Sequence, residues 1–110
     1  MIPGTAPAEI PVLSPSGDLD HATIVPFAEA LESASTQHPA IIVDLSDVAF
    51  GDSTFLNTLL RCHHLTDLRL AGAPLLLSRL FAITGLHQAL HLYPSVEAAQ
   101  NPPSPPSGAV

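Results

Sequence analysis

The segment from Ala40 to Leu70 constrains the fold most, because the spacing of its hydrophobic residues changes part-way along. Residues 40–45, AIIVDL, form a short apolar run, which predicts a strand that is buried on both faces. From Phe55 as far as Leu70, apolar residues recur every three or four positions, which predicts a long amphipathic helix. A strand that is buried on both faces needs neighbouring strands and covering helices, so the segment favours an α/β domain.

A short polar link, residues 51–54, joins this strand to this helix. Gly51 allows a tight turn, and either Asp52 or Ser53 is suited to cap the helix. The Ser53 hydroxyl is therefore expected at the positive end of a helix, where a phosphate group is tolerated. The spacing alone favours a plainer interpretation, in which the serine is only a capping residue.

The residues before this segment predict a strand and a helix. Residues 9–19 have an apolar centre, but two prolines remove backbone donors, so we expect an edge or bulged strand. Asp20 is a suitable N-cap, and a helix is expected to begin near residues 23–26 and to end by Ser35. The alternation of strand and helix predicts parallel pairing with right-handed crossovers.

The last third of the chain is predicted from its glycines and prolines. Gly72 is expected to stop the long helix, and Gly85 a later short one. The predicted elements are a strand at 75–78, a short helix at 80–84, a last strand at 87–92 and a terminal helix through Gln100 capped by Ser95.

The length of 110 residues fits one domain, which we place at residues 9–100. Residues 1–8 contain two prolines and no hydrophobic periodicity, which predicts a flexible tail. Residues 101–110 contain four prolines, which predicts a disordered, proline-rich tail. Residues 1–4 lack the basic region of a signal peptide, and no apolar span of about 20 residues occurs. We therefore expect a cytoplasmic protein that is not attached to a membrane.

The composition argues against several classes of partner and site. Three arginines and no lysine stand against ten acidic residues, and the formal net charge is −7, which disfavours nucleic acid and anionic membrane as partners. Cys62 is the single cysteine, so a disulfide framework or a thiolate metal cluster is excluded. Of six histidines, His63 and His64 are adjacent and point about 100° apart on a helix, without acidic partners at metal spacing. We expect no metal and no cofactor.

Enzyme classes also find little support. The sequence has no glycine-rich phosphate loop, and a chain without lysine cannot form a Walker A site. Ser53 and Asp52 could be joined with a histidine into a hydrolytic triad, but the G-x-S-x-G elbow is absent. We therefore expect a protein that is not an enzyme, with no catalytic residues.

The segment VDLSDVAFGDSTFLNTLL, residues 43–60, resembles the motif of the STAS domain, the fold of anti-sigma factor antagonists. Two flanking segments support the resemblance in the right order. Residues 17–21, GDLDH, resemble the family's G-E-L-D segment. Residues 83–86, ITGL, and 93–99, YPSVEAA, resemble its L-T-G-L and Y-x-S-x-x-E-A ending. The resemblance extends over about residues 9–100.

The resemblance implies a mixed sheet of four or five strands with helices largely on one side. It implies that Ser53 is phosphorylated by a partner anti-sigma factor that is also a serine kinase. The unphosphorylated form would bind this anti-sigma factor and free a sigma factor, and phosphorylation would break the complex, thereby regulating transcription. The expected partner-binding residues are Asp20, Asp52, Ser53, Thr54 and Phe55. The apolar excess leaves a monomer or a weak homodimer open.

The sequence departs from the family pattern in three places. Family members usually have glycine two residues after the phosphorylated serine, where this chain has Phe55, a bulky group expected either to be docking surface or to narrow access for the kinase. The family usually has a further strand before the G-E-L-D strand, and this chain offers only some eight residues, with prolines among them, to form it. Pro26 lies within the predicted first helix. An alternative function therefore stays open, a non-switching STAS scaffold or ligand-sensing module of a larger regulatory complex, in which Ser53 only caps the helix.

Overall fold

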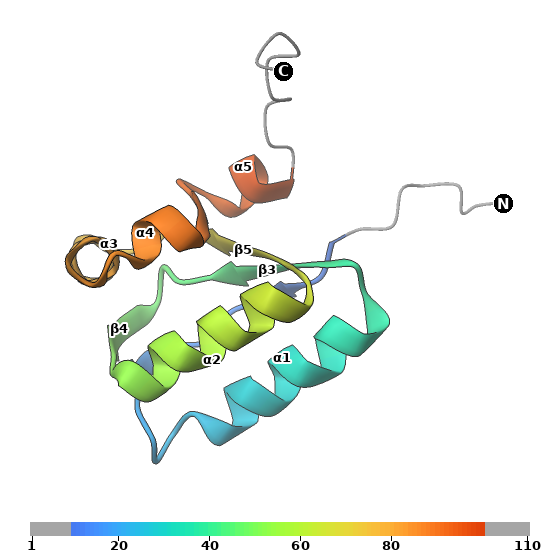
Figure 1. Cartoon of the computed structure of the whole chain (residues 1–110), viewed down its shortest axis with the longest axis horizontal. Helices are drawn as coiled ribbons and strands as arrows, with labels where there is room; N and C mark the ends of the chain where they lie inside the picture. Colours follow the sequence, from blue (N-terminus) through green and yellow to red (C-terminus); the bar gives the residue numbers. More distant parts are fainter. Residues whose placement is uncertain (1–9, 101–110) are drawn as a thin grey trace, which may run out of the picture.

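The computed structural model describes residues 10–100, which fold as an α/β domain (Figure 1). The predicted tails, residues 1–8 and 101–110, lie outside the described residues. The elements in chain order are β1 (Val12–Leu13), β2 (Gly17–Leu19), α1 (Val25–Gln37), β3 (Ala40–Asp44), β4 (Val48–Gly51), α2 (Ser53–Leu65), β5 (Asp67–Ala71), α3 (Leu75–Thr84), α4 (Leu86–Ala89), β6 (His91–Tyr93) and α5 (Val96–Gln100).

The strands form a four-stranded sheet in the order β1-β3-β5-β6 and a separate pair, β2-β4. Within residues 10–100 every strand pair is parallel, as the alternation of strands and helices predicts. The antiparallel pair that a mixed sheet requires is not among them. Ile42 of the central strand β3 lies between Val12 of β1 and Arg69 of β5 in the register.

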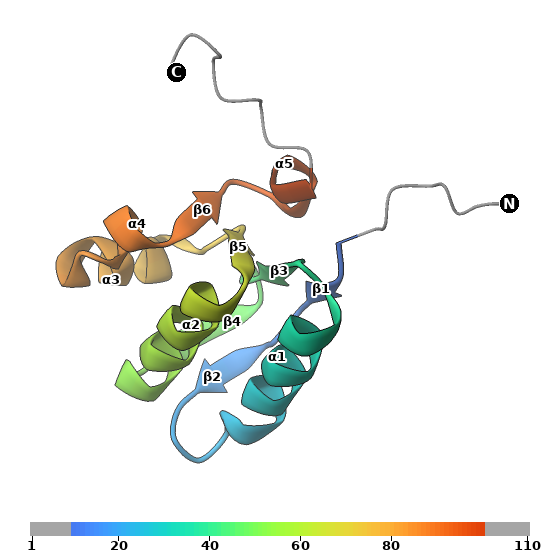
Figure 2. The ribbon, with the colours of Figure 1, turned by 45° about the vertical axis from the view of Figure 1, so that its right-hand side comes forward.

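The two faces of the four-stranded sheet are covered unequally. Ile41 and Val43 of β3 belong to the main hydrophobic cluster, which is shared with α1, α2 and α3. Ile42, between them in the chain, belongs to a small cluster on the other face with Ala71 and Ala99 of α5. Figure 2 shows α1 and α2 on one side of the sheet and the short α5 on the other. The expectation of helices largely on one side is thus met.

The segment 66–78 corrects two predictions. The helix expected to continue to Leu70 ends at Leu65, and residues 67–71 form β5. From Asp67 to Leu70 of β5 the burial alternates, with Leu68 and Leu70 in the core and Asp67 and Arg69 half-buried, so the period is that of a strand. The apolar run predicted as a strand at 75–78 instead begins α3. Apolar residues three apart occur in helices and in strands, so their spacing does not distinguish the two. The pairing with β3 makes residues 67–71 a strand.

The N-terminal part also differs from its prediction. The strand expected over residues 9–19 is two short strands, β1 and β2, which lie in different sheets. The helix start near residues 23–26 is confirmed, because α1 begins at Val25 and Pro26 falls in its first turn, where a missing N–H costs little. The helix continues to Gln37, two residues beyond the predicted end.

Two predicted helix signals near the C-terminus are confirmed. Gly85 ends α3 with φ of 79°, a left-handed conformation that favours glycine. The Ser95 hydroxyl oxygen accepts a hydrogen bond from the Ala98 amide at 3.1 Å, so Ser95 caps α5. The last strand is shorter than expected, because residues 86–89 form α4 and only His91–Tyr93 pair. None of the helices in the described part of the chain is long and apolar enough to span a bilayer.

Candidate functional site

Ser53 is the first residue of α2, and its side chain is exposed. The chain reaches it from β4, whose last residue, Gly51, is followed directly by Asp52. The N-terminus of a helix carries a partial positive charge and unpaired amide groups. The hydroxyl of Ser53 is therefore presented to solvent at a position that tolerates negative charge.

Asp52, and not Ser53, caps α2. Asp52 Oδ1 accepts a hydrogen bond from the Phe55 amide at 3.2 Å. Among residues 10–100, no side-chain hydrogen bond involves the Ser53 hydroxyl. The interpretation of Ser53 as only a capping residue thus loses its structural basis, because the neighbouring carboxylate fills that role.

Asp52 also ties the start of α2 to the loop after β2. Its Oδ2 accepts a hydrogen bond from the His21 amide at 3.2 Å, and the Asp52 amide donates to the Leu19 carbonyl at 3.2 Å. The parallel pairing of β2 with β4 sets Leu19 opposite Gly51. Two segments that are more than 30 residues apart in sequence therefore meet at one end of the domain.

Asp20 lies in that loop, as the resemblance implies, but it does not cap α1. Its Oδ1 accepts hydrogen bonds from the Ala22 amide at 2.9 Å and the Thr23 amide at 3.1 Å, so it closes the turn before the helix. The helix begins after Ile24 without a side-chain cap. The Ala22 hydrogen bond, followed by those of Thr23, lowers the pKa of the Asp20 carboxyl, which favours its charged form.

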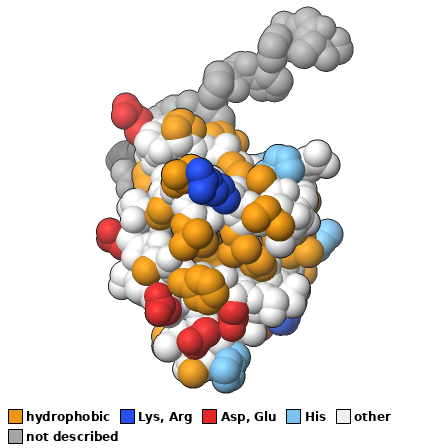
Figure 3. Space-filling view, turned by 90° about the vertical axis from the view of Figure 1, so that its left-hand side faces the viewer, with side chains coloured by type: hydrophobic (Ala, Val, Ile, Leu, Met, Phe, Trp, Pro, Cys, Tyr) orange, Lys and Arg blue, Asp and Glu red, His pale blue; other side chains and the backbone are white. Residues whose placement is uncertain are grey.

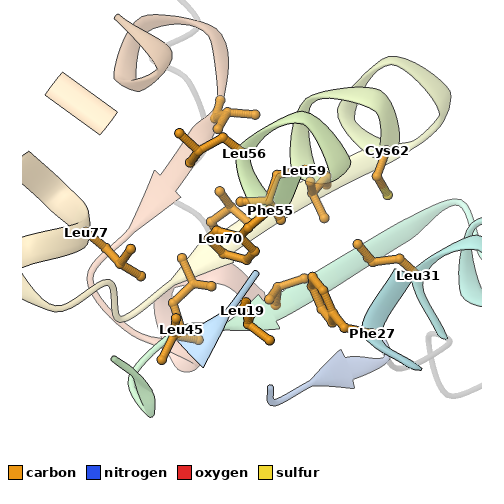
Figure 4. Packing of buried hydrophobic residues seen from close by; sticks show 14 of the residues in the cluster. Leu19, Phe27, Leu31, Leu45, Phe55, Leu56, Leu59, Cys62, Leu70 and Leu77 are labelled. Carbon is orange, nitrogen blue, oxygen red and sulfur yellow. The ribbon is translucent and has the colours of Figure 1, made fainter. Parts of the chain in front are cut away.

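Phe55 corrects one predicted site residue. Its side chain is 0% exposed, and its ring centroid lies 6.1 Å from that of Phe27, inside the main cluster (Figure 4). Phe55 begins the inward stripe of α2, which continues with Leu56, Leu59 and Cys62. Phe55 is therefore a core residue and not docking surface. Thr54 is half-buried, and its carbonyl accepts a hydrogen bond from the Thr58 hydroxyl at 2.8 Å.

Gly51 provides the room for that ring, and this role replaces the predicted tight turn. A Cβ atom on Gly51 would lie 2.8 Å from Phe55 Cε2 and closer still to Cδ2. Real Cβ contacts are never so short, so a larger residue here requires the ring to move. The sequence did not indicate this contact, because nothing in spacing shows which way the Phe55 ring points.

Two hollows in the described part of the chain are lined by residues other than Ser53. One hollow of about 120 Å³ lies between α1 and α2, where Arg61 and Glu32 are among the lining residues. A second, more open hollow is lined by residues between Leu13 and Ala30. Among residues 10–100, no three histidine, cysteine or acidic side chains are grouped so as to hold a metal ion. The exposed hydroxyl thus belongs to a surface and to neither of these hollows.

The structure combines a parallel sheet, two helices on one of its faces and an exposed hydroxyl next to an aspartate cap. This arrangement agrees with the fold that the motif resemblance implies. The chain belongs to the STAS domain family: residues 5–94 match a family model described as "Mlab, STAS domain". No curated protein matched the sequence.

Three solved structures are similar to this chain. An anti-sigma factor antagonist from Mycobacterium paratuberculosis is 28% identical, with a TM-score of 0.69 and 80% of each chain covered. The STAS domain of a SulP transporter from Vibrio cholerae is 23% identical, with a TM-score of 0.66, and the match covers 86% of this chain and 80% of that one. The anti-sigma factor antagonist SpoIIAA in its unphosphorylated form is 21% identical, with a TM-score of 0.66, and the match covers 83% of this chain and 86% of that one.

Proposed function

We propose that this protein is an anti-sigma factor antagonist whose binding is switched by phosphorylation of Ser53. One observation carries the proposal: Ser53 is an exposed hydroxyl at the first position of α2, released from capping by Asp52. The 28% identity to an anti-sigma factor antagonist supports the same class of partner. The partner is a protein, an anti-sigma factor with serine kinase activity, and the antagonist itself is not an enzyme.

The local charges explain how a phosphate would act. A phosphate on Ser53 adds about −1.5 to −2 charge at the start of α2, which the helix dipole tolerates, so the fold is not disturbed. The carboxylates of Asp20 and Asp52 already surround the site from two linked segments. A partner surface that fits a neutral hydroxyl would then meet a much larger negative charge and lose the desolvated contact.

The burial of Phe55 bears on the kinase. Because the ring points into the core, it does not stand between an approaching active site and Ser53. The chain on either side, Asp52 and Thr54, is held in place by hydrogen bonds of the helix start. The kinase is therefore expected to reach the hydroxyl on a formed helix, without unfolding of α2.

The test is a kinase and binding assay with the purified anti-sigma factor encoded nearest to this chain's gene. With ATP, one phosphate is expected on Ser53 by mass spectrometry. Binding should then weaken at least about 30-fold, which corresponds to about 2 kcal/mol of binding free energy. Ser53→Ala should bind in the presence of ATP as tightly as the unmodified protein. Ser53→Asp should bind poorly. Ser33→Ala, at an exposed serine of α1, is the matched control and should still be phosphorylated at Ser53 and released.

A non-switching role in a larger complex is the alternative, since the fold is also similar to the STAS domain of a SulP transporter. Equal binding by the phosphorylated protein and by Ser53→Asp would defeat the switch. Stable purification within a larger complex, with no phosphate on Ser53, would support the alternative. Labelling of Ser53 by a serine-reactive phosphonate would point to a hydrolase, and we expect none.

A further inference from the structure

Helix α3 is hydrophobic on the side turned away from the core as well as on the side turned toward it. Leu77 and Phe81 fill the core, with exposures of 1% and 0%. Leu75, Leu76 and Ile83 are 67%, 59% and 81% exposed. A helix that is apolar all round is normally buried on all sides. The outward face of α3 therefore lacks a partner within the described part of the chain.

Strand β4 extends this face toward the candidate site. It packs beside α3, and its Phe50 is 48% exposed. Ser53 follows only three residues later. Figure 3 shows hydrophobic side chains gathered on this side of the molecule around one basic side chain, with acidic side chains along their lower border. We call the exposed side chains of Phe50, Leu75, Leu76 and Ile83 the α3–β4 surface.

The α3–β4 surface has a positive charge among its apolar side chains and negative charges at one border. Arg79 is the one charged residue of α3 and is exposed, three residues after Leu76 and four before Ile83, so it lies on the same side of the helix. The loop and cap residues near Ser53 supply the carboxylates of Asp20 and Asp52. An apolar surface with a cation among its side chains and anions at one border fixes the orientation of a partner that docks there.

We infer that the α3–β4 surface docks the same partner that recognises Ser53, so that the partner covers α3 and the start of α2 together. This inference rests on the proposed function. The partner's face would present apolar side chains to α3, a carboxylate to Arg79 and basic side chains to Asp20 and Asp52. A second copy of this chain fits poorly, because two copies bring net charges of −7 together. An anionic lipid surface is repelled by the same acidic border.

The experiment measures binding of the full chain to the purified anti-sigma factor used above. The double variant Leu76→Asp/Ile83→Asp should weaken binding about 30-fold or more, the range of interface hot spots. Arg79→Glu should weaken it about tenfold and reduce its dependence on salt. Leu65→Asp is the matched control, because Leu65 is 74% exposed at the opposite end of α2 and should bind like the wild type.

Further measurements distinguish a failure of this inference from a failure of the proposed function. Circular dichroism and urea unfolding verify that the variants fold, as expected for exposed positions. If Ser53 is phosphorylated and releases the partner while the double variant binds as Leu65→Asp does, the inference fails and the proposed function stands. If sedimentation shows a wild-type dimer that the double variant abolishes, the surface belongs to a second copy and the inference is overturned. A wild type that does not bind the anti-sigma factor overturns both proposals.

Discussion

Gly51 and Phe55 are complementary in size across the turn that holds Ser53. The ring lies over the glycine, where no side chain would fit, and it also contacts the ring of Phe27. Family members usually carry glycine at the position of Phe55, and here the ring fills space that the glycine of β4 leaves open. The bulky residue near Ser53 is thus accommodated inward, and the surface around Ser53 stays clear of it.

Gly51→Ala should destabilise the fold by about 1 to 3 kcal/mol, because the added methyl group displaces the Phe55 ring from a packed core. The free energy of unfolding in urea measures the effect. Phe55→Leu alone should also cost stability, but the double variant should lose less than the sum of the two single changes. Additive losses would show that the two side chains are not in contact.

At the scale of the element, α2 meets the edge strand β6 through histidines. The ring of His63 lies edge-on to that of His91, with centroids 5.2 Å apart, and His64 and Asp67 are also near. His63 Nδ1 is buried without a hydrogen-bond partner in residues 10–100. Burial, followed by repulsion from His91 and His64, lowers the pKa of His63 below its ordinary value of 6.5.

This lowered pKa predicts that stability falls as the pH drops. Above about pH 6.5 the imidazole is neutral in both states, so it adds no pH dependence. Below that value the unfolded chain binds the proton first, and the free energy of unfolding decreases until the folded state is protonated as well. Urea unfolding between pH 7.5 and 5 should show a smaller decrease for His63→Gln than for the wild type. An equal slope in both proteins would exclude this histidine as the cause.

The elements also show how far the sequence determined the fold. The apolar run of β3 and the period of α2 predicted the central strand, the helix and the link with Asp52 and Ser53 between them. The boundary at Thr66 was missed because Leu68 follows Leu65 at helical spacing, and only the ladder with β3 makes residues 67–71 a strand. β4 was missed because the strand has only four residues, VAFG, and the two in the middle are exposed, so the segment shows no alternating hydrophobic pattern.

The candidate site was predicted for a different reason. The motif resemblance predicted that the loop of Asp20 and the start of α2 both belong to the site. Spacing alone could not predict that these two segments meet, which the hydrogen bond from the His21 amide to Asp52 shows. The inward turn of Phe55 and the outward leucines of α3 depend on tertiary packing. A single apolar run such as residues 75–77 does not reveal which of its members face solvent.

At the scale of the whole molecule, α5 buries the face of the four-stranded sheet that lies opposite the main hydrophobic cluster. Ile42 and Ala71 are fully buried there against Ala99, and Arg69 donates a hydrogen bond to the Ala99 carbonyl at 2.7 Å. The family match ends at residue 94, before α5 begins. The family model therefore does not include the helix that covers this face, although the resemblance of residues 93–99 does.

A chain shortened to residues 1–94 should lose at least about 2 kcal/mol of stability, because Ile42 becomes exposed and Arg69 loses its carbonyl partner. Chemical denaturation and binding of a hydrophobic dye report the change. A chain shortened to residues 1–100 is the matched control and should unfold like the full protein. If both behave alike, α5 is dispensable for the fold.

The position of α5 decides where this domain can be joined to another polypeptide. A fusion or affinity tag attached after Gln100 leaves α5 in place over Ile42. A fusion attached at Tyr93 would remove α5 and leave Ile42 exposed, and aggregation of such a hybrid would report the loss of this cover and not a property of Ser53. Cloning boundaries drawn at the end of the family match, residue 94, would remove α5 in this way.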